Sequence, residues 1–373
     1  MSDTLEKIEV PTVAPRRRGR HLRSVAIVVV GILLILAPLS LSSFWLQIGL
    51  AIAGAGLGAI GLNLLVGSTG QLSFAHPVFV AVGAVGYAWL AGSAEDGAGL
   101  GGLGLPPLLA AILAVVAAGV VGIVISPLAS RLKGIYLGVA TIALIFVAQH
   151  VLDNWRSASG GYNGRISPEL SIFGFSFADG MSELTIAGVP FGRDEKLWYV
   201  GLVVLFAGIV VARNMLDSRL GRSMAAVRDS EVLAAMNGID VRRCKRHVFA
   251  ISAIYAGTAG VIYALAVGSV TPEAFDLPMS INYLAMIVIG GLGSVWGSVL
   301  GAALVTALPL LLQQHAASLP IITATGESGG VDAAAAARYI FALTIIVVLL
   351  LQPRGLAGLV QDLGLRIRRF SSR

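Results

Sequence analysis

Six polar side chains interrupt a long apolar part of the chain within fourteen residues: Asn63, Ser68, Thr69, Gln71, Ser73 and His76. If this stretch lies at membrane depth, these groups need partners from protein, water or a solute. Hydroxyls, amides and an imidazole can donate and accept hydrogen bonds, as passage of a polar solute requires. Two interpretations stay open: a loop that ends at Pro77, or a broken helix that lines a passage.

Two glycine-rich segments also carry polar side chains. Gly160, Gly161 and Asn163 lie in the first, and Gly290, Gly291, Gly293 and Ser294 lie in the second. Turns and close helix packing are the ordinary uses of such glycines. We nevertheless predict that both segments, with Asn63, Gln71, Ser73 and His76, line a passage or its gate. The nearby Glu273, Asp276 and Asn282 are suited to capping the following span.

The segment 213–247 is strongly charged and holds eight of the 26 Lys and Arg residues. Its middle, 221–238, predicts one short amphipathic helix between two glycines, with small apolar side chains on one face. We interpret it as a docking surface for a soluble partner and expect the glycines to form turns. Its candidate docking residues are Gly221, Arg222, Ala225, Arg228, Asp229, Glu231, Ala234, Ala235 and Gly238, with Leu233 on the apolar face.

Several classes of site are absent from the sequence. No Gly-Lys pair occurs, which excludes the GxxxxGK[ST] phosphate loop. The five histidines have no metal-site spacing, and Cys244 is the only cysteine. No polar cluster suggests catalysis, so we predict a protein that is not an enzyme and needs no metal or cofactor.

The composition is that of a membrane protein. Hydrophobic residues make up 56% and charged residues 12% of the 373 residues, and the mean hydropathy is +0.86. We predict an all-α polytopic protein with about ten transmembrane helices, some broken or re-entrant. The predicted spans are 24–41, 44–66, 77–92, 106–129, 134–152, 196–212, 248–268, 281–293, 295–312 and 339–352.

Basic residues predict the orientation, because cytoplasmic segments are rich in Lys and Arg. Four segments that such a topology places on one side hold 21 of the 26 basic residues. The tails 1–23 and 353–373 are therefore expected in the cytoplasm on either side of a membrane domain, 24–352. Within that domain, 213–247 is expected inside and 153–195 outside. The first apolar run is too long, and its flank too charged, for a removed signal peptide.

Six motifs, in order, resemble those of branched-chain amino acid ABC transporter permeases. They are Gly61–His76 with Gly-Gln-Leu-Ser, Arg131–Leu137, Gly160–Gly164, Gly221–Ile239, Pro272–Ile281 and Gly290–Gly297. The match covers roughly 50–312, and the long outer loop resembles the M-type subunit. Departures are Ser159, where the family usually has Thr, Ala75 and Pro77 beside His76, and the unmatched segment 316–337.

The resemblance implies an ABC importer permease in the bacterial inner membrane, with both termini cytoplasmic. It would import Leu, Ile or Val by alternating access. The implied partners are an H-type permease, two cytoplasmic ATPases that dock on 213–247, a periplasmic or lipid-anchored solute-binding protein and membrane lipid, without nucleic acid. Because the departures bear on the solute, urea, short amides and other small organic solutes remain alternatives.

Two other classes of protein compete with this interpretation. A stand-alone secondary transporter or channel would explain broken helices but gives no reason for the charged helix in 213–247. Ion coupling also favours carboxylates within the membrane, whereas 24–152 contains only Glu95 and Asp96, both in an expected loop. A membrane-embedded enzyme lacks a catalytic cluster.

Overall fold

The structure is a computed structural model that describes residues 29, 31–93, 101–172, 174–178, 185–186, 189–314, 322–323 and 331–332, and parts of 339–358. The helices are η1 (Ala37–Leu39), α2 (Ser43–Thr69), α3 (His76–Ala91), α4 (Pro107–Arg131), α5 (Ile135–Asn154), α6 (Arg156–Ser159), η2 (Gly161–Asn163), α7 (Arg193–Asp217), α8 (Arg219–Asp229), α9 (Glu231–Met236), α10 (Val241–Val267), η3 (Pro272–Ala274), α11 (Leu277–Gly290) and α12 (Val295–Gln314). The strands are β1 (Arg165–Ile166), β2 (Ser171–Ile172), β3 (Phe175–Ser176), β4 (Thr185–Ile186), β5 (Val189–Pro190), β6 (Ser269–Val270), β7 (Ile322–Thr323) and β8 (Val331–Asp332).

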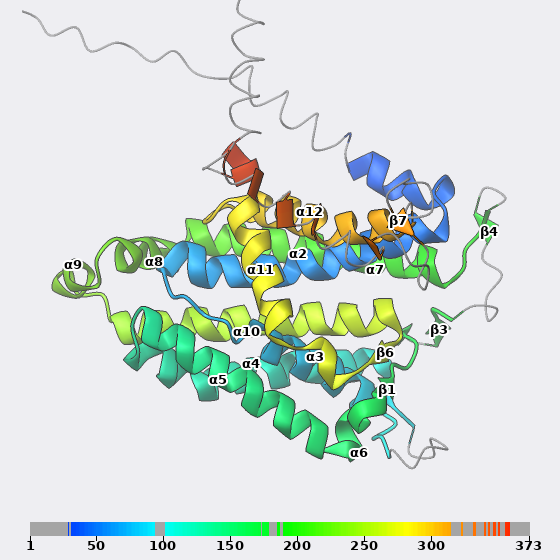
Figure 1. Ribbon diagram of the computed structural model, residues 1–373, viewed down its shortest axis with the longest axis horizontal. Helices are drawn as coiled ribbons and strands as arrows, with labels where there is room; N and C mark the ends of the chain where they lie inside the picture. Colours follow the sequence, from blue (N-terminus) through cyan, green and yellow to red (C-terminus); the bar gives the residue numbers. More distant parts are fainter. Residues whose placement is uncertain are drawn as a thin grey trace, which may run out of the picture.

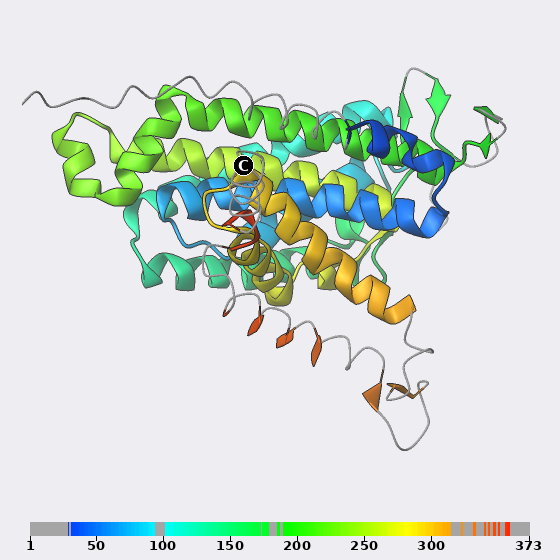
Figure 2. The same cartoon turned by 90° about the horizontal axis from the view of Figure 1, so that it is seen from above.

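The long helices form an elongated bundle with two different ends (Figures 1 and 2). Helices α2, α7 and α10 run along its long axis, whereas α11 lies across α2. We call the end with α8 and α9 the α9 end, and the end with α6, β1 and β6 the β1 end. Strands β1 and β6 pair antiparallel there, with Arg165 opposite Val270. The predicted inner and outer segments therefore lie at opposite ends.

Helices α2 and α10 form the centre of the bundle. In each, 78% of the most apolar stretch is buried, against 22% in α5 and 17% in α7. Small residues allow this close packing. A Cβ at Gly83 of α3 would overlap the backbone of Gly257, and one at Gly260 would overlap the carbonyl of Val80. Backbone contact between α3 and α10 therefore requires glycine at these positions.

The observed helices agree with most predicted spans and extend several of them. Six helices of the described part, α2, α4, α5, α7, α10 and α12, are long and apolar enough to cross a membrane. Helix α3 is shorter, and α11 ends at Gly290, before the predicted limit. Parts of the predicted spans 24–41 and 339–352 lie outside the described residues, so the count of ten stays a prediction.

The capping predictions can be compared with the observed helix starts. Asp276 caps α11, because its Oδ1 accepts a hydrogen bond from the backbone N–H of Met279 at 2.9 Å. Glu273 belongs instead to η3, and Asn282 lies within α11. The capping prediction was right for Asp276 and wrong for the other two. Most of the unmatched segment 316–337 lies outside the described residues.

Candidate functional site

Asn63, in the last two turns of α2, holds the turn between α11 and α12. Only 4% of its surface is exposed. Its Nδ2 donates to the carbonyl oxygens of Gly291 at 3.3 Å and Ser294 at 3.0 Å. The same amide donates to Ser298 Oγ at 2.7 Å, while Asn63 Oδ1 accepts from the N–H of Gly293 at 2.8 Å. One buried side chain thus fixes both sides of the turn, because an amide can donate and accept at once.

The glycines of this turn are required by its geometry. Gly291 and Gly293 have φ of +114° and +81°, in the region that favours glycine. A Cβ at Gly290 would overlap the carbonyl of Gly297, so the backbones of α11 and α12 touch there. The close-packing interpretation of this motif is confirmed, and its predicted part in a gate stays a prediction.

Arg228 of α8 contacts the same region. Its Nη1 donates to the carbonyl oxygen of Gly67 at 2.7 Å, in the last turn of α2. Carbonyls at a helix C-terminus lack helical partners and attract cations. A Cβ at Gly67 would lie 2.5 Å from the Gly293 nitrogen. Three separate motifs therefore meet at what we call the α2 junction, formed by Asn63, Gly67, Arg228 and Gly293.

The polar interruption continues from this junction into the protein interior. Helix α2 ends at Thr69, and α3 begins at His76. Gln71 Nε2 donates to Thr69 Oγ1 at 2.9 Å, but Gln71 Oε1 is buried without a hydrogen-bond partner. Ser73 Oγ accepts from the N–H of Ala75 at 3.3 Å. The break between α2 and α3 fits both a connecting loop and a broken helix, so the two interpretations stay open.

The side chains expected to line a passage are covered by the chain itself. Gln71, Ser73 and His76 are exposed by only 4%, 2% and 2%. The His76 ring meets the Tyr283 ring edge-on at 4.8 Å, and its Nε2 is buried without a hydrogen-bond partner. Their predicted contact with a solute therefore requires a rearrangement that uncovers them.

The charged segment contains two short helices where one was predicted. Helix α8 ends at Asp229, and Ser230 starts α9 by accepting a hydrogen bond from the N–H of Leu233 at 3.3 Å. Gly221 lies inside α8, so its predicted role in a turn was wrong. A Cβ there would overlap the Leu216 carbonyl. Gly238 does form a turn, with φ of +79°.

The exposed apolar face of this segment differs in part from the predicted one. Ala234 is only 2% exposed, so its prediction as a docking residue was wrong for this arrangement. Val232, Leu233 and Met236 are exposed by 69%, 61% and 78%. The other predicted residues Arg222, Ala225, Asp229 and Ala235 are also exposed. The spacing of apolar residues on one continuous helix could not predict this face, because the chain changes direction at Ser230, between α8 and α9.

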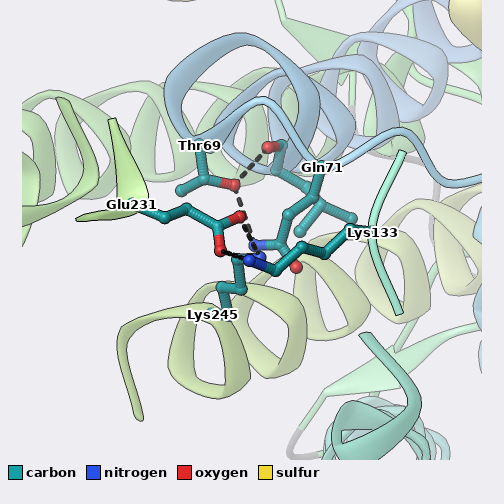
Figure 3. Close-up of polar contacts among 6 residues, drawn as sticks. Thr69, Gln71, Lys133, Glu231 and Lys245 are labelled. Carbon is teal, nitrogen blue, oxygen red and sulfur yellow. Dashed lines mark hydrogen bonds and ion pairs between the residues drawn. The ribbon is translucent and has the colours of Figure 1, made fainter. Parts of the chain in front are cut away.

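Glu231 of α9 pairs with lysines of two other elements (Figure 3). Its Oε2 lies 2.8 Å from Lys133 Nζ, in the turn before α5, and its Oε1 lies 2.5 Å from Lys245 Nζ of α10. Partial burial alone would raise the pKa of Glu231, but hydrogen bonds and charge from both lysines lower it. The pairing of these two lysines with Glu231 could not be predicted from the sequence, which reveals only their basic character.

Gly160, Gly161 and Asn163 lie at the β1 end, away from the α2 junction. They line an open cavity of about 1340 Å³ together with Arg156 and Glu273. Gly160 and Gly161 have φ of +80° and +61°, which glycine favours. The structure therefore divides the predicted pathway residues into two groups at different levels of the bundle.

Ser159, the departure from the family pattern, supports the loop that carries this cavity. Its Oγ donates to the carbonyl oxygen of Leu152 at 2.5 Å. The same oxygen accepts from the N–H of Gly161 at 3.0 Å. The hydroxyl of Ser159, a group that Thr also carries, makes both of these bonds.

Comparisons with known proteins place the chain among permeases. The profile of the family described as branched-chain amino acid transport system, permease component, matches residues 44–350. The high-affinity branched-chain amino acid transport system permease protein LivM of Escherichia coli is 31% identical over 255 residues, 66% of this chain and 58% of that protein. A probable LivM of Methanocaldococcus jannaschii is 24% identical over 209 residues, 54% of this chain and 56% of that protein.

A ribose import permease, RbsC of Escherichia coli, is 28% identical over 121 residues, 31% of this chain and 36% of that protein. No solved structure matches the chain. The chain spans 56–58% of the length of the LivM relatives it matches. The family profile covers most of the chain, including every element of the α2 junction. This chain belongs to the family of branched-chain amino acid transport system permease components.

Proposed function

We propose that this chain is a permease subunit of an ABC importer that moves branched-chain amino acids across the bacterial inner membrane by alternating access. Separate subunits hydrolyse the ATP. The observation that carries the proposal is the α2 junction, where Arg228 of the charged segment bonds to α2 beside the turn held by Asn63. A movement of the charged segment can therefore reach the broken helix directly.

The surface of α9 supports an ATPase as the docking partner. Val232, Leu233 and Met236 expose apolar surface on α9, and Arg222 and Asp229 of α8 are exposed too. A helix-in-groove contact buries such an apolar face, and the charged rim sets its register. Two cytoplasmic ATPases, an H-type permease and a periplasmic or lipid-anchored solute-binding protein complete the proposed importer. Both termini lie in the cytoplasm in this proposal.

Uptake measurements test the substrate. A strain that lacks this chain is compared with the same strain carrying it, with labelled Leu, Ile, Val, urea and short amides as solutes. We expect the chain to restore uptake of Leu, Ile and Val. Restored uptake of urea or amides alone would replace the proposed substrate while keeping the ABC importer. Uptake that persists when the partner ATPases are deleted would contradict an ATP-driven function.

A further inference from the structure

Helix α5 covers the polar interruption with one narrow face. Its buried residues are Leu137, Gly138, Thr141 and Ile145, which recur along one side of the helix. Thr141 Oγ1 accepts a hydrogen bond from the N–H of Phe74 at 3.0 Å. A Cβ at Gly138 would lie 3.4 Å from the Phe74 ring, so the two segments are in close contact. The rest of α5 is largely exposed on the bundle surface.

The covered segment contains two polar atoms that the protein leaves without hydrogen bonds. They are Gln71 Oε1 and His76 Nε2. An unpaired polar atom in the interior is unfavourable, and such atoms in a native structure call for a reason. A second state, in which these two atoms bond to water or to a polar solute, would supply that reason. The segment would then alternate between the covered state seen here and an uncovered state.

The end of α5 nearest α9 is held by the charged segment. Lys133 lies in the turn just before α5 and pairs with Glu231 of α9 at 2.8 Å. The same carboxylate pairs with Lys245 of α10. The Lys133 side chain is 69% exposed and that of Lys245 only 4%. An exposed pair separates at little cost, whereas a buried pair resists separation. Glu231 therefore stays on α10 while its contact with the α5 turn can break.

Resting on the proposed function, we propose that Lys133 is a positioning residue for transport. Its ion pair with Glu231 keeps α5 over the polar interruption. Movement of the charged segment breaks that pair and lets α5 move off Phe74, which opens to the solute the polar interruption that holds Gln71 and His76. The Thr141–Phe74 hydrogen bond is the second contact that closes this cover.

Thiol accessibility tests the proposal in membranes that contain the whole transporter. The probe is Ser73→Cys, in the covered segment, in a Cys244→Ala background, and the reagent is a small hydrophilic methanethiosulfonate. Lys133→Gln should raise the rate of modification about two- to five-fold, the range that loss of an exposed ion pair produces. Thr141→Val should raise the rate too, by removing a different contact.

Three matched variants show whether the effect depends on these specific contacts or on the loss of a positive charge alone. Arg131→Gln removes a neighbouring charge that has no ion pair among the described residues, and Lys133→Arg and Thr141→Ser keep the contacts. All three should leave the rate unchanged. An unchanged rate in both Lys133→Gln and Thr141→Val, or an equal rise in Arg131→Gln, would overturn the proposal. Because labelling needs no substrate, this outcome is distinct from failure of the proposed transport function, which the uptake measurement detects.

Discussion

Arg228 Nη1 lies 2.7 Å from the carbonyl oxygen of Gly67, although the two residues are 161 positions apart in the sequence. The bond joins the charged segment to the last turn of α2. Gly67 also lies against Gly293, in the turn that Asn63 holds. Arg228 therefore bonds directly to α2 beside the α11–α12 turn, so we expect a displacement of α8 to act on both.

Arg228→Gln should weaken the coupling of ATP hydrolysis to uptake. A hydrogen bond from a charged donor contributes about 1.5–3 kcal/mol, and solvent exposure of Arg228 reduces this to roughly 1 kcal/mol, a factor of about five. The measurement is the ratio of solute imported to ATP hydrolysed in vesicles. Arg219→Gln is the control, because Arg219 is exposed on the same helix and its side chain has no hydrogen bond or ion pair within the described residues. Equal ratios in the two variants would refute a special role for Arg228.

Asn63→Ala should destabilise the folded protein. The substitution leaves several buried polar groups of the turn without partners, at a cost of about 2–4 kcal/mol. Thermal unfolding of the purified complex in detergent measures the change. Asn154→Ala is the control, since Asn154 is exposed and, within the described part of the chain, its side chain bonds only to His150 of its own helix. We expect that control to change stability by less than about 0.5 kcal/mol. An equal loss of stability in both variants would contradict the role of Asn63 in holding the α11–α12 turn.

Leu233→Glu and Ala234→Glu should have different effects although they are neighbours. Leu233 is exposed, so a charge there should abolish co-purification with the ATPase and leave thermal stability intact. Ala234 is buried, so a charge there should lower thermal stability by about 2–4 kcal/mol. Leu233→Ala should weaken co-purification only partly. Full co-purification of Leu233→Glu would disprove docking through this face.

Two cysteine probes test the orientation in the Cys244→Ala background. The probes are Met236→Cys at the α9 end and Tyr162→Cys at the β1 end. The native residues at these positions are 78% and 80% exposed. A membrane-impermeant maleimide should label position 162 in intact spheroplasts and position 236 only after permeabilisation. The reverse pattern would invert the topology predicted from the basic residues.

The sequence by itself determined the class of protein and the positions of most helices. Long apolar runs, glycine breaks and local signals such as Asp276 before α11 depend on residues close together in the chain. The basic segments likewise needed no tertiary information. The family resemblance, later matched by the profile over 44–350, also came from ordered local motifs.

Only the tertiary structure decided which side chains meet. Helices such as α2 are apolar on all sides, and lipid and protein interior are similarly apolar, so their pattern does not reveal the buried face. The sequence predicts a pathway role for both Asn63 and Gln71. In the structure, Asn63 holds the α11–α12 turn, whereas Gln71 has a buried oxygen without a hydrogen-bond partner. The pairing of Glu231 with Lys133 and Lys245 depends on how α9, α10 and the turn before α5 pack, which no local pattern encodes.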